Sequence, residues 1–175
     1  MNRGNFGHPE VIIFGLKVAM NNLGPWSNDD FEHLSWHDVH VHGFKLEQYD
    51  SDNGSADLLL DIDYILKWEL SSTGYYVFTV CQAILRFQQV FGFRFTLDYK
   101  TPTTGMCPFS IHGIERESTE SANGYKSYRW RLPINWPAGL IEFEAPSFAQ
   151  TLVGTPHVQS EQSLAPSKRR NAPAP

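Results

Sequence analysis

The chain has 175 residues, of which 41% are hydrophobic and 14% aromatic, so it can bury the core of one domain. Its net charge is −5, but residues 1–153 carry eleven Lys and Arg against eighteen Asp and Glu, a net charge of −7. A negative potential of this kind repels phosphate backbones, which argues against nucleic-acid binding and favours a basic protein partner.

The two cysteines and an N-terminal apolar run bear on the cellular setting. Cys81 and Cys107 form no CxxC pair, and Cys81 lies in the apolar run 77–85, where a buried thiol is the expected role. The run 11–20 is too short to span a bilayer, is interrupted by Lys17 and is followed by no cleavage site. We therefore expect neither membrane insertion nor secretion, but a reduced, cytoplasmic setting.

Residues 1–22 do not share the pattern of the residues after them, so we expect a peripheral segment and Met20 as the native start. Ser27 then predicts a short helix over residues 28–34, because its hydroxyl can accept an orphan amide of the first turn. Acidic residues in that turn complement the helix dipole. This helix should seal one end of the core.

The hydrophobic period changes to two after the helix, which predicts strands. Val39 and Val41 alternate with polar residues, and the alternation slips by one residue at Gly43, as it does at a β-bulge. A polar turn over 49–56 leads to a second alternating run, so a hairpin is expected. The apolar face of that run consists of Leu58, Leu60, Ile62, Tyr64, Leu66 and Trp68.

The bulge predicts how the two strands pair. Phe44 should lie opposite Ile62, which brings His42 close to Asp63 and places Asp38 opposite Lys67. Such exposed cross-strand charge pairs contribute about 0.2–1 kcal/mol each, so we expect them to fix the strand register and to add little stability.

Further strands are predicted over 75–87, 90–98 and 109–115, and a hairpin over 125–134 and 140–145. Residues 83–91 also fit a helical face, which is the alternative there, and residues 116–124 are typical of a polar turn.

The aromatic residues stop at about Gly154, and Pro, Ser, Gln and Ala replace them. A segment of that composition buries too little apolar surface to offset its conformational entropy, so we expect 154–175 to be disordered. The result is one all-β, mainly antiparallel domain over residues 23–153. We predict a β-sandwich or a partly open barrel of about seven to eight strands with a short N-terminal helix.

One constellation could carry metal chemistry. His40 and His42 point to one face of a strand, and Asp61 and Asp63 lie on the next strand, so together they could bind a divalent metal. The alternative is a solvated sheet face whose histidines and carboxylates pair with each other. No other cofactor and no catalytic residue is predicted, because the acidic turn at residues 50–61 fails the EF-hand spacing and no nucleophile motif is present.

The tryptophans suggest a third kind of site. Trp68 and Trp130 fall on apolar strand faces and should be core, whereas Trp136 sits in a turn next to Pro137. An exposed indole can anchor a partner, so a concave patch containing Trp136 or Trp26 would indicate a small-ligand or carbohydrate binder.

Residues 34–38, 41–43 and 58–65, followed by Trp68, together resemble a family of small uncharacterised bacterial proteins, a domain of unknown function. The resemblance covers residues 27–156. It implies a bacterial, cytoplasmic setting and no activity that transfers to single residues.

The function expected from these observations is a non-enzymatic binding or interaction module with an acidic surface, of an immunity or scaffolding type. The alternatives are the metal site of the first hairpin, either as a metal-binding protein or as a metal-dependent enzyme, and the aromatic ligand site.

Overall fold

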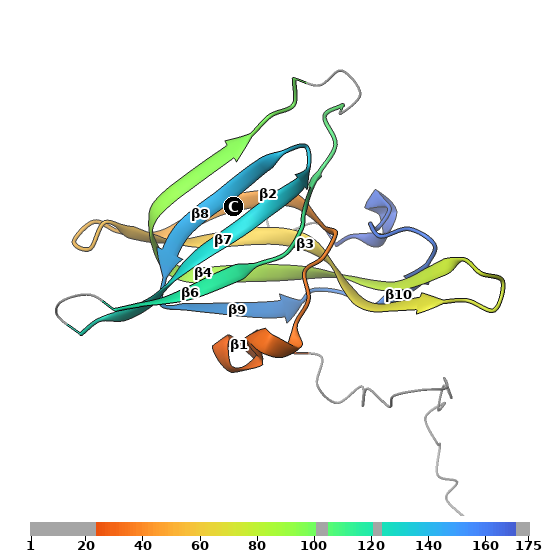
Figure 1. The fold of residues 1–175 in the computed structure, drawn as a ribbon, viewed down its shortest axis with the longest axis horizontal. Helices are drawn as coiled ribbons and strands as arrows, with labels where there is room; N and C mark the ends of the chain where they lie inside the picture. Colours follow the sequence, from red (N-terminus) through yellow and green to blue (C-terminus); the bar gives the residue numbers. More distant parts are fainter. Residues whose placement is uncertain (1–23, 101–104, 121–123, 171–175) are drawn as a thin grey trace, which may run out of the picture.

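A computed structural model describes residues 24–100, 105–120 and 124–170 (Figure 1). The predictions for residues 1–22 and for Met20 as the native start lie outside the described residues. The elements in chain order are β1 (Trp26–Ser27), η1 (Asn28–His33), β2 (Val39–Asp50), β3 (Ser55–Leu70), β4 (Tyr76–Leu97), β5 (Phe109–Ile111), β6 (Glu115–Glu120), β7 (Lys126–Trp136), β8 (Gly139–Ala145), β9 (Ser147–Leu152), β10 (His157–Gln159) and η2 (Pro166–Lys168).

The ten strands belong to one antiparallel sheet, with the order β1-β9-β4-β3-β2-β5-β7-β6, β8 between β4 and β7, and β10 beside β4. Since β8 pairs with both β4 and β7, the pairings return on themselves and the sheet curls into two layers (Figure 1). Strands β1, β6, β9 and β10 lie outside this circuit, so the sheet is not a clean barrel. The predicted all-β, mainly antiparallel class is confirmed, with ten strands among the described residues in place of seven or eight.

The strand β4 runs through the position where two strands or a helix were predicted. Its first half pairs with β3 and β9, and its last residues pair with β8 in the other layer. Gln89 (φ 52°) and Gly92 (φ 63°) have left-handed backbone conformations at the point where β4 changes partner. The chain therefore bends there without ending the strand. The prediction of strand over 75–87 and 90–98 is confirmed except for the break expected between them, and the helical alternative was wrong.

The hairpin of β2 and β3 forms as predicted, with a register shift between Val41 and Gly43 that confirms the bulge. The predicted pairing was wrong, however, because Phe44 lies opposite Leu60 and not Ile62. A second register shift between Glu47 and Asp50 sits next to the turn, and the alternation of side chains does not reveal it. A polar turn was predicted over residues 116–124, but Glu115–Glu120 forms β6 and pairs with β7, so that prediction was wrong for residues 116–120.

The core fills the space between the two layers. Phe87 of β4 contacts both Trp130 of β7, at 5.0 Å between ring centroids, and Phe143 of β8, at 4.7 Å. Trp130 is fully buried, but Trp68 is 41% exposed, so the prediction that Trp68 is core was wrong. A register shift between Ile65 and Lys67 reverses the alternation and moves Trp68 to the outer face of the sheet.

Residues 154–170, here called the C-terminal strap, are ordered, so the prediction of disorder was wrong for them. β10 pairs with β4, and beyond it the chain places Leu164, 4% exposed, against Phe78 and Val80 on the outer face of the sheet (blue in Figure 1). Composition failed here because a few anchoring contacts on an existing surface order a segment that could not fold alone.

Candidate binding surface

The segment from η1 to β2 positions the first residues of the surface. The expected helix forms as η1, and its first turn is closed by Asp30, whose carboxylate accepts the Ser27 amide at 2.8 Å. At the other end of the segment, Asp38 has φ 59°, and its carboxylate accepts hydrogen bonds from the side-chain amides of Asn135 and Gln162. These contacts replace the predicted pairing of Asp38 with Lys67, which was wrong.

His37 is held between these two anchors. Its Nδ1 lies 3.2 Å from the His112 carbonyl oxygen, and its Nε2 lies 3.4 Å from the Asp38 carboxylate. The imidazole stacks on the Trp68 indole, with ring centroids 5.9 Å apart and planes 14° apart, and the His112 ring meets it edge-on. Side chains from the segments before β2 and β6 and from the end of β3 therefore meet at one place on the surface.

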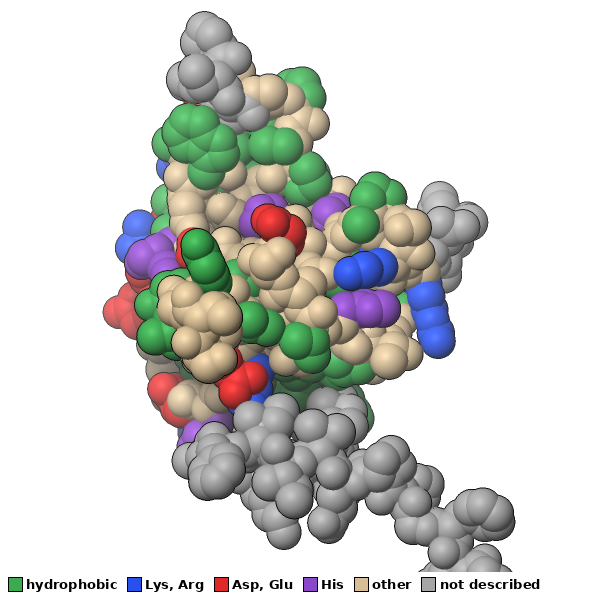
Figure 2. Space-filling model, turned by 90° about the vertical axis from the view of Figure 1, so that its right-hand side faces the viewer, with side chains coloured by type: hydrophobic (Ala, Val, Ile, Leu, Met, Phe, Trp, Pro, Cys, Tyr) green, Lys and Arg blue, Asp and Glu red, His purple; other side chains and the backbone are tan. Residues whose placement is uncertain are grey.

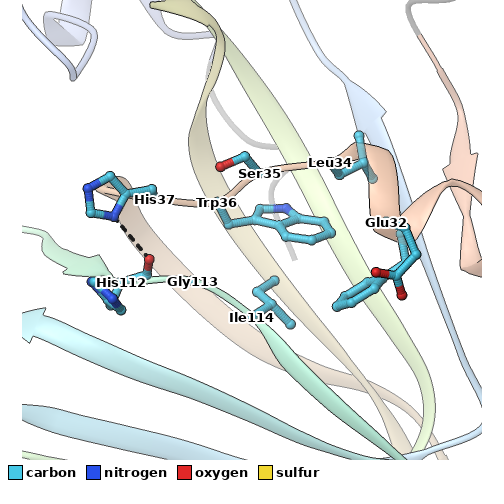
Figure 3. Close-up of a pocket in the computed structure, with 9 residues that line it drawn as sticks. Glu32, Leu34, Ser35, Trp36, His37, His112, Gly113 and Ile114 are labelled. Carbon is cyan, nitrogen blue, oxygen red and sulfur yellow. Dashed lines mark hydrogen bonds between the residues drawn. The ribbon is translucent and has the colours of Figure 1, made fainter.

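A cleft with a volume of about 220 Å³ opens beside His37 (Figure 3). Trp36 and Ile114 lie at its middle, the two histidines border one side, and Glu32 borders the other. The Trp36 indole nitrogen donates to Gln150 Oε1 at 2.7 Å, so the ring is fixed and 3% exposed. A fixed, buried aromatic ring thus lies behind the cleft, and the Glu32 carboxylate at its rim pairs with Arg116 at 3.2 Å.

The end of the β3–β4 hairpin carries four exposed large side chains, called here the hairpin aromatic surface. They are Trp68 (41% exposed), Leu70 (64%), Tyr75 (76%) and Tyr76 (56%). Leu70 and Tyr76 lie opposite each other in the ladder, and the Trp68 and Tyr76 rings are 5.9 Å apart. Figure 2 views the molecule from the side on which this hairpin projects, where hydrophobic and histidine side chains gather among a few charged ones.

The hairpin turn is locked by its own hydrogen bonds. The Ser71 amide donates to the Tyr75 carbonyl at 2.8 Å, and the Gly74 amide donates to the Ser71 carbonyl at 3.0 Å. The hydroxyls of Ser71 and Thr73 bind each other at 2.8 Å. The aromatic side chains are therefore presented on a preorganised support.

The residues predicted as a metal site gather around an arginine. Asp63 is fully buried; it accepts hydrogen bonds from His42 Nε2 at 2.7 Å, from the Leu164 amide at 2.8 Å and from the Arg169 guanidinium. Arg169 also donates to Asp61 at 2.6 Å, and Gln82 donates to Asp61 at 3.0 Å. The predicted proximity of His42 and Asp63 is confirmed, and the cation beside both carboxylates is the guanidinium of the strap.

His40 lies next to this carboxylate cluster but forms no hydrogen bond through its buried Nδ1. Burial lowers the pKa of His40, and the nearby Asp63 charge opposes that lowering. Within residues 24–100, 105–120 and 124–170, no three His, Cys, Asp or Glu side chains are placed to hold one metal ion. The carboxylates that the metal hypothesis requires are thus engaged by Arg169.

The two tryptophans predicted to bind a ligand have different positions. Trp26 is 8% exposed and packs against Tyr64 in the core, with ring centroids 5.6 Å apart, so it is not available to a ligand and that prediction was wrong. Trp136 is 48% exposed at the end of β7 but does not line the cleft. Trp36 lines it instead, and the sequence signal that could have singled it out is its place directly after the capped helix.

The surface as a whole is acidic, since residues 24–170 contain twelve Lys and Arg against eighteen Asp and Glu, a net charge of −6.

No family model matches the chain, and no curated protein matches its sequence. In the described part of the chain, no helix is long and apolar enough to cross a membrane.

Proposed function

We propose that this protein is a non-enzymatic interaction module that binds a basic protein partner through the hairpin aromatic surface and the cleft beside it. The observation that carries the proposal is the exposure of Trp68, Leu70, Tyr75 and Tyr76 on one locked hairpin. The bacterial, cytoplasmic setting and the immunity or scaffolding role expected from the sequence belong to this proposal.

Exposed aromatic side chains of this size are a source of binding energy. Burial of apolar surface contributes about 25 cal/mol per Å², and Trp and Tyr are the residue types most enriched among interface hot spots. Since the locked turn already orders the hairpin, little conformational entropy is lost when a partner covers it.

The size of the cleft fits one side chain of a protein partner better than it fits a separate small molecule. Its volume of about 220 Å³ is below the roughly 300–1,000 Å³ of small-molecule sites. A Lys or Arg side chain of a partner can enter it and approach the Glu32 carboxylate, which also pairs with Arg116 at 3.2 Å. The net charge of −6 favours the same kind of partner and would accelerate its association.

The test compares capture by three immobilised proteins from a lysate of the source cell. These are the wild type, the double variant Trp68→Ala/Tyr76→Ala, and Tyr49→Ala, whose ring is 75% exposed on β2. We expect a basic protein to be retained by the wild type and Tyr49→Ala and lost with the double variant. Calorimetry on the purified partner should then show binding that weakens as salt concentration rises.

The double variant must first show a cooperative thermal transition, since the Trp68 ring also packs against His37 and Phe78. Retention of the same proteins by the double variant would overturn the proposal. So would a captured partner that is acidic or whose affinity does not respond to salt.

A further inference from the structure

The strand β2 has two edges that are occupied to different extents. One edge pairs with β3 from His40 to Asp50, whereas the other pairs with β5 only from Val39 to Val41. Among the residues that the structure describes, no strand covers that second edge from Gly43 onward. Backbone amides and carbonyls on an uncovered edge are a template for another strand.

The side chains along the uncovered stretch are unusually apolar for a free edge. Phe44 is 47% exposed and Leu46 is 54% exposed, although both lie on the face whose partners in β3, Leu60 and Leu58, are fully buried. Phe44 is supported from one side by Phe95 of β4, at 5.2 Å between ring centroids. A strand added at this edge would extend the inner face of the sheet over both side chains.

The charges on the opposite face match a second copy of the same strand. Lys45 and Glu47 flank Leu46 and form an ion pair with each other, and Glu47 also pairs with Arg86 at 3.0 Å. In an antiparallel pairing of two β2 strands about a twofold axis at Leu46, Lys45 of each copy lies opposite Glu47 of the other. The stretch is therefore complementary to itself in charge, and the same pairing brings the two Leu46 side chains into contact.

We propose that two copies of this chain associate through β2, with Phe44–Glu47 of each copy added as an antiparallel strand to the uncovered edge of the other. We assign a second copy to this edge because the same pairing brings the two Leu46 side chains together on one face and forms two Lys45–Glu47 pairs on the other. The contact uses the end of β2 remote from His37, so it is independent of the proposed partner surface.

Sedimentation equilibrium over a wide concentration range tests the proposal. We expect the 19.9 kDa chain to double its mass with rising concentration. Lys45→Glu alone, or Glu47→Lys alone, places like charges opposite each other twice and should weaken the dimer about tenfold or more. The exchange variant Lys45→Glu/Glu47→Lys restores opposite charges and should recover the wild-type dissociation constant to within a few fold.

Thermal melting of each variant shows that the fold is retained, and Tyr49→Ala serves as a matched control outside the complementary pairs. A wild type that stays monomeric at all concentrations would overturn the proposal. A dimer that the single reversals leave unchanged, or that the exchange variant fails to restore, would show that another surface forms it.

Discussion

Two outer faces of the same sheet carry ion pairs of the same chemistry in opposite surroundings. On the face of β2, β3 and β4, the Arg169 side chain is 10% exposed and the Asp63 side chain is not exposed at all. On the face of β6, β7 and β8, Arg131 is 49% exposed and its partners Glu115 and Glu142 are 59% and 33% exposed. The first face is covered by the C-terminal strap, and the second is open to water.

The difference shows what each set of charges can do. A buried carboxylate without its cation keeps the full cost of desolvation, so the Arg169 contact ties the end of the chain to the fold. The exposed arginines and glutamates are screened by water and salt, and they mainly hold the register of β6, β7 and β8. Arg169 thus stabilises the attachment of the C-terminal strap to the sheet, whereas replacing Arg131 should change the stability little.

The largest effect is expected for Arg169→Gln, which leaves Asp63 buried without its cation. We expect the free energy of unfolding to fall by about 3–5 kcal/mol, measured by urea denaturation. Lys168→Gln is the matched control, since Lys168 is exposed and its amine contacts the Gln159 amide oxygen, at 3.0 Å. A loss below about 1 kcal/mol for Arg169→Gln would mean that the two faces do not differ in the way described.

A pH effect of intermediate size is expected from His40 beside the same cluster. Because burial lowers its pKa in the folded protein, the unfolded chain binds a proton more readily below its ordinary value of 6.5. Stability should therefore be fully present above pH 6.5 and fall as pH drops toward the folded pKa, with a slope of at most about 1.4 kcal/mol per pH unit.

His40→Gln removes this titration, so its stability should fall less steeply than that of the wild type as the pH drops below 6.5. Denaturant midpoints at closely spaced pH values measure the two slopes. Equal slopes would exclude His40 as the source.

The smallest effect is expected for Arg131→Gln on the exposed face. We expect a loss of about 0.2–1 kcal/mol that disappears in high salt, measured by the same denaturation. A loss as large as that for Arg169→Gln would show that the ladder of β6, β7 and β8 is more than a set of screened pairs.

The alternation of residues was enough to predict the strand class and the bulge at Gly43, whereas the contact of His42 with Asp63 was predicted from a pairing that is two residues out of register. The class and the bulge follow from local periodicity, because successive side chains of a strand point to opposite faces. The expected helix after Ser27 also formed, since its capping signal lies within three residues of the site it acts on.

The tertiary structure alone decided the features that depend on contacts between distant segments. The register shift between Ile65 and Lys67 places Trp68 on the outer face of the sheet, where it forms part of the proposed binding surface. The alternation of residues in β3 does not predict this shift. Arg169 reached Asp61 and Asp63 from more than a hundred positions away, which ordered a segment whose composition predicts disorder. Composition and period report what a segment would do alone, whereas the energy of these contacts comes from surfaces that other segments provide.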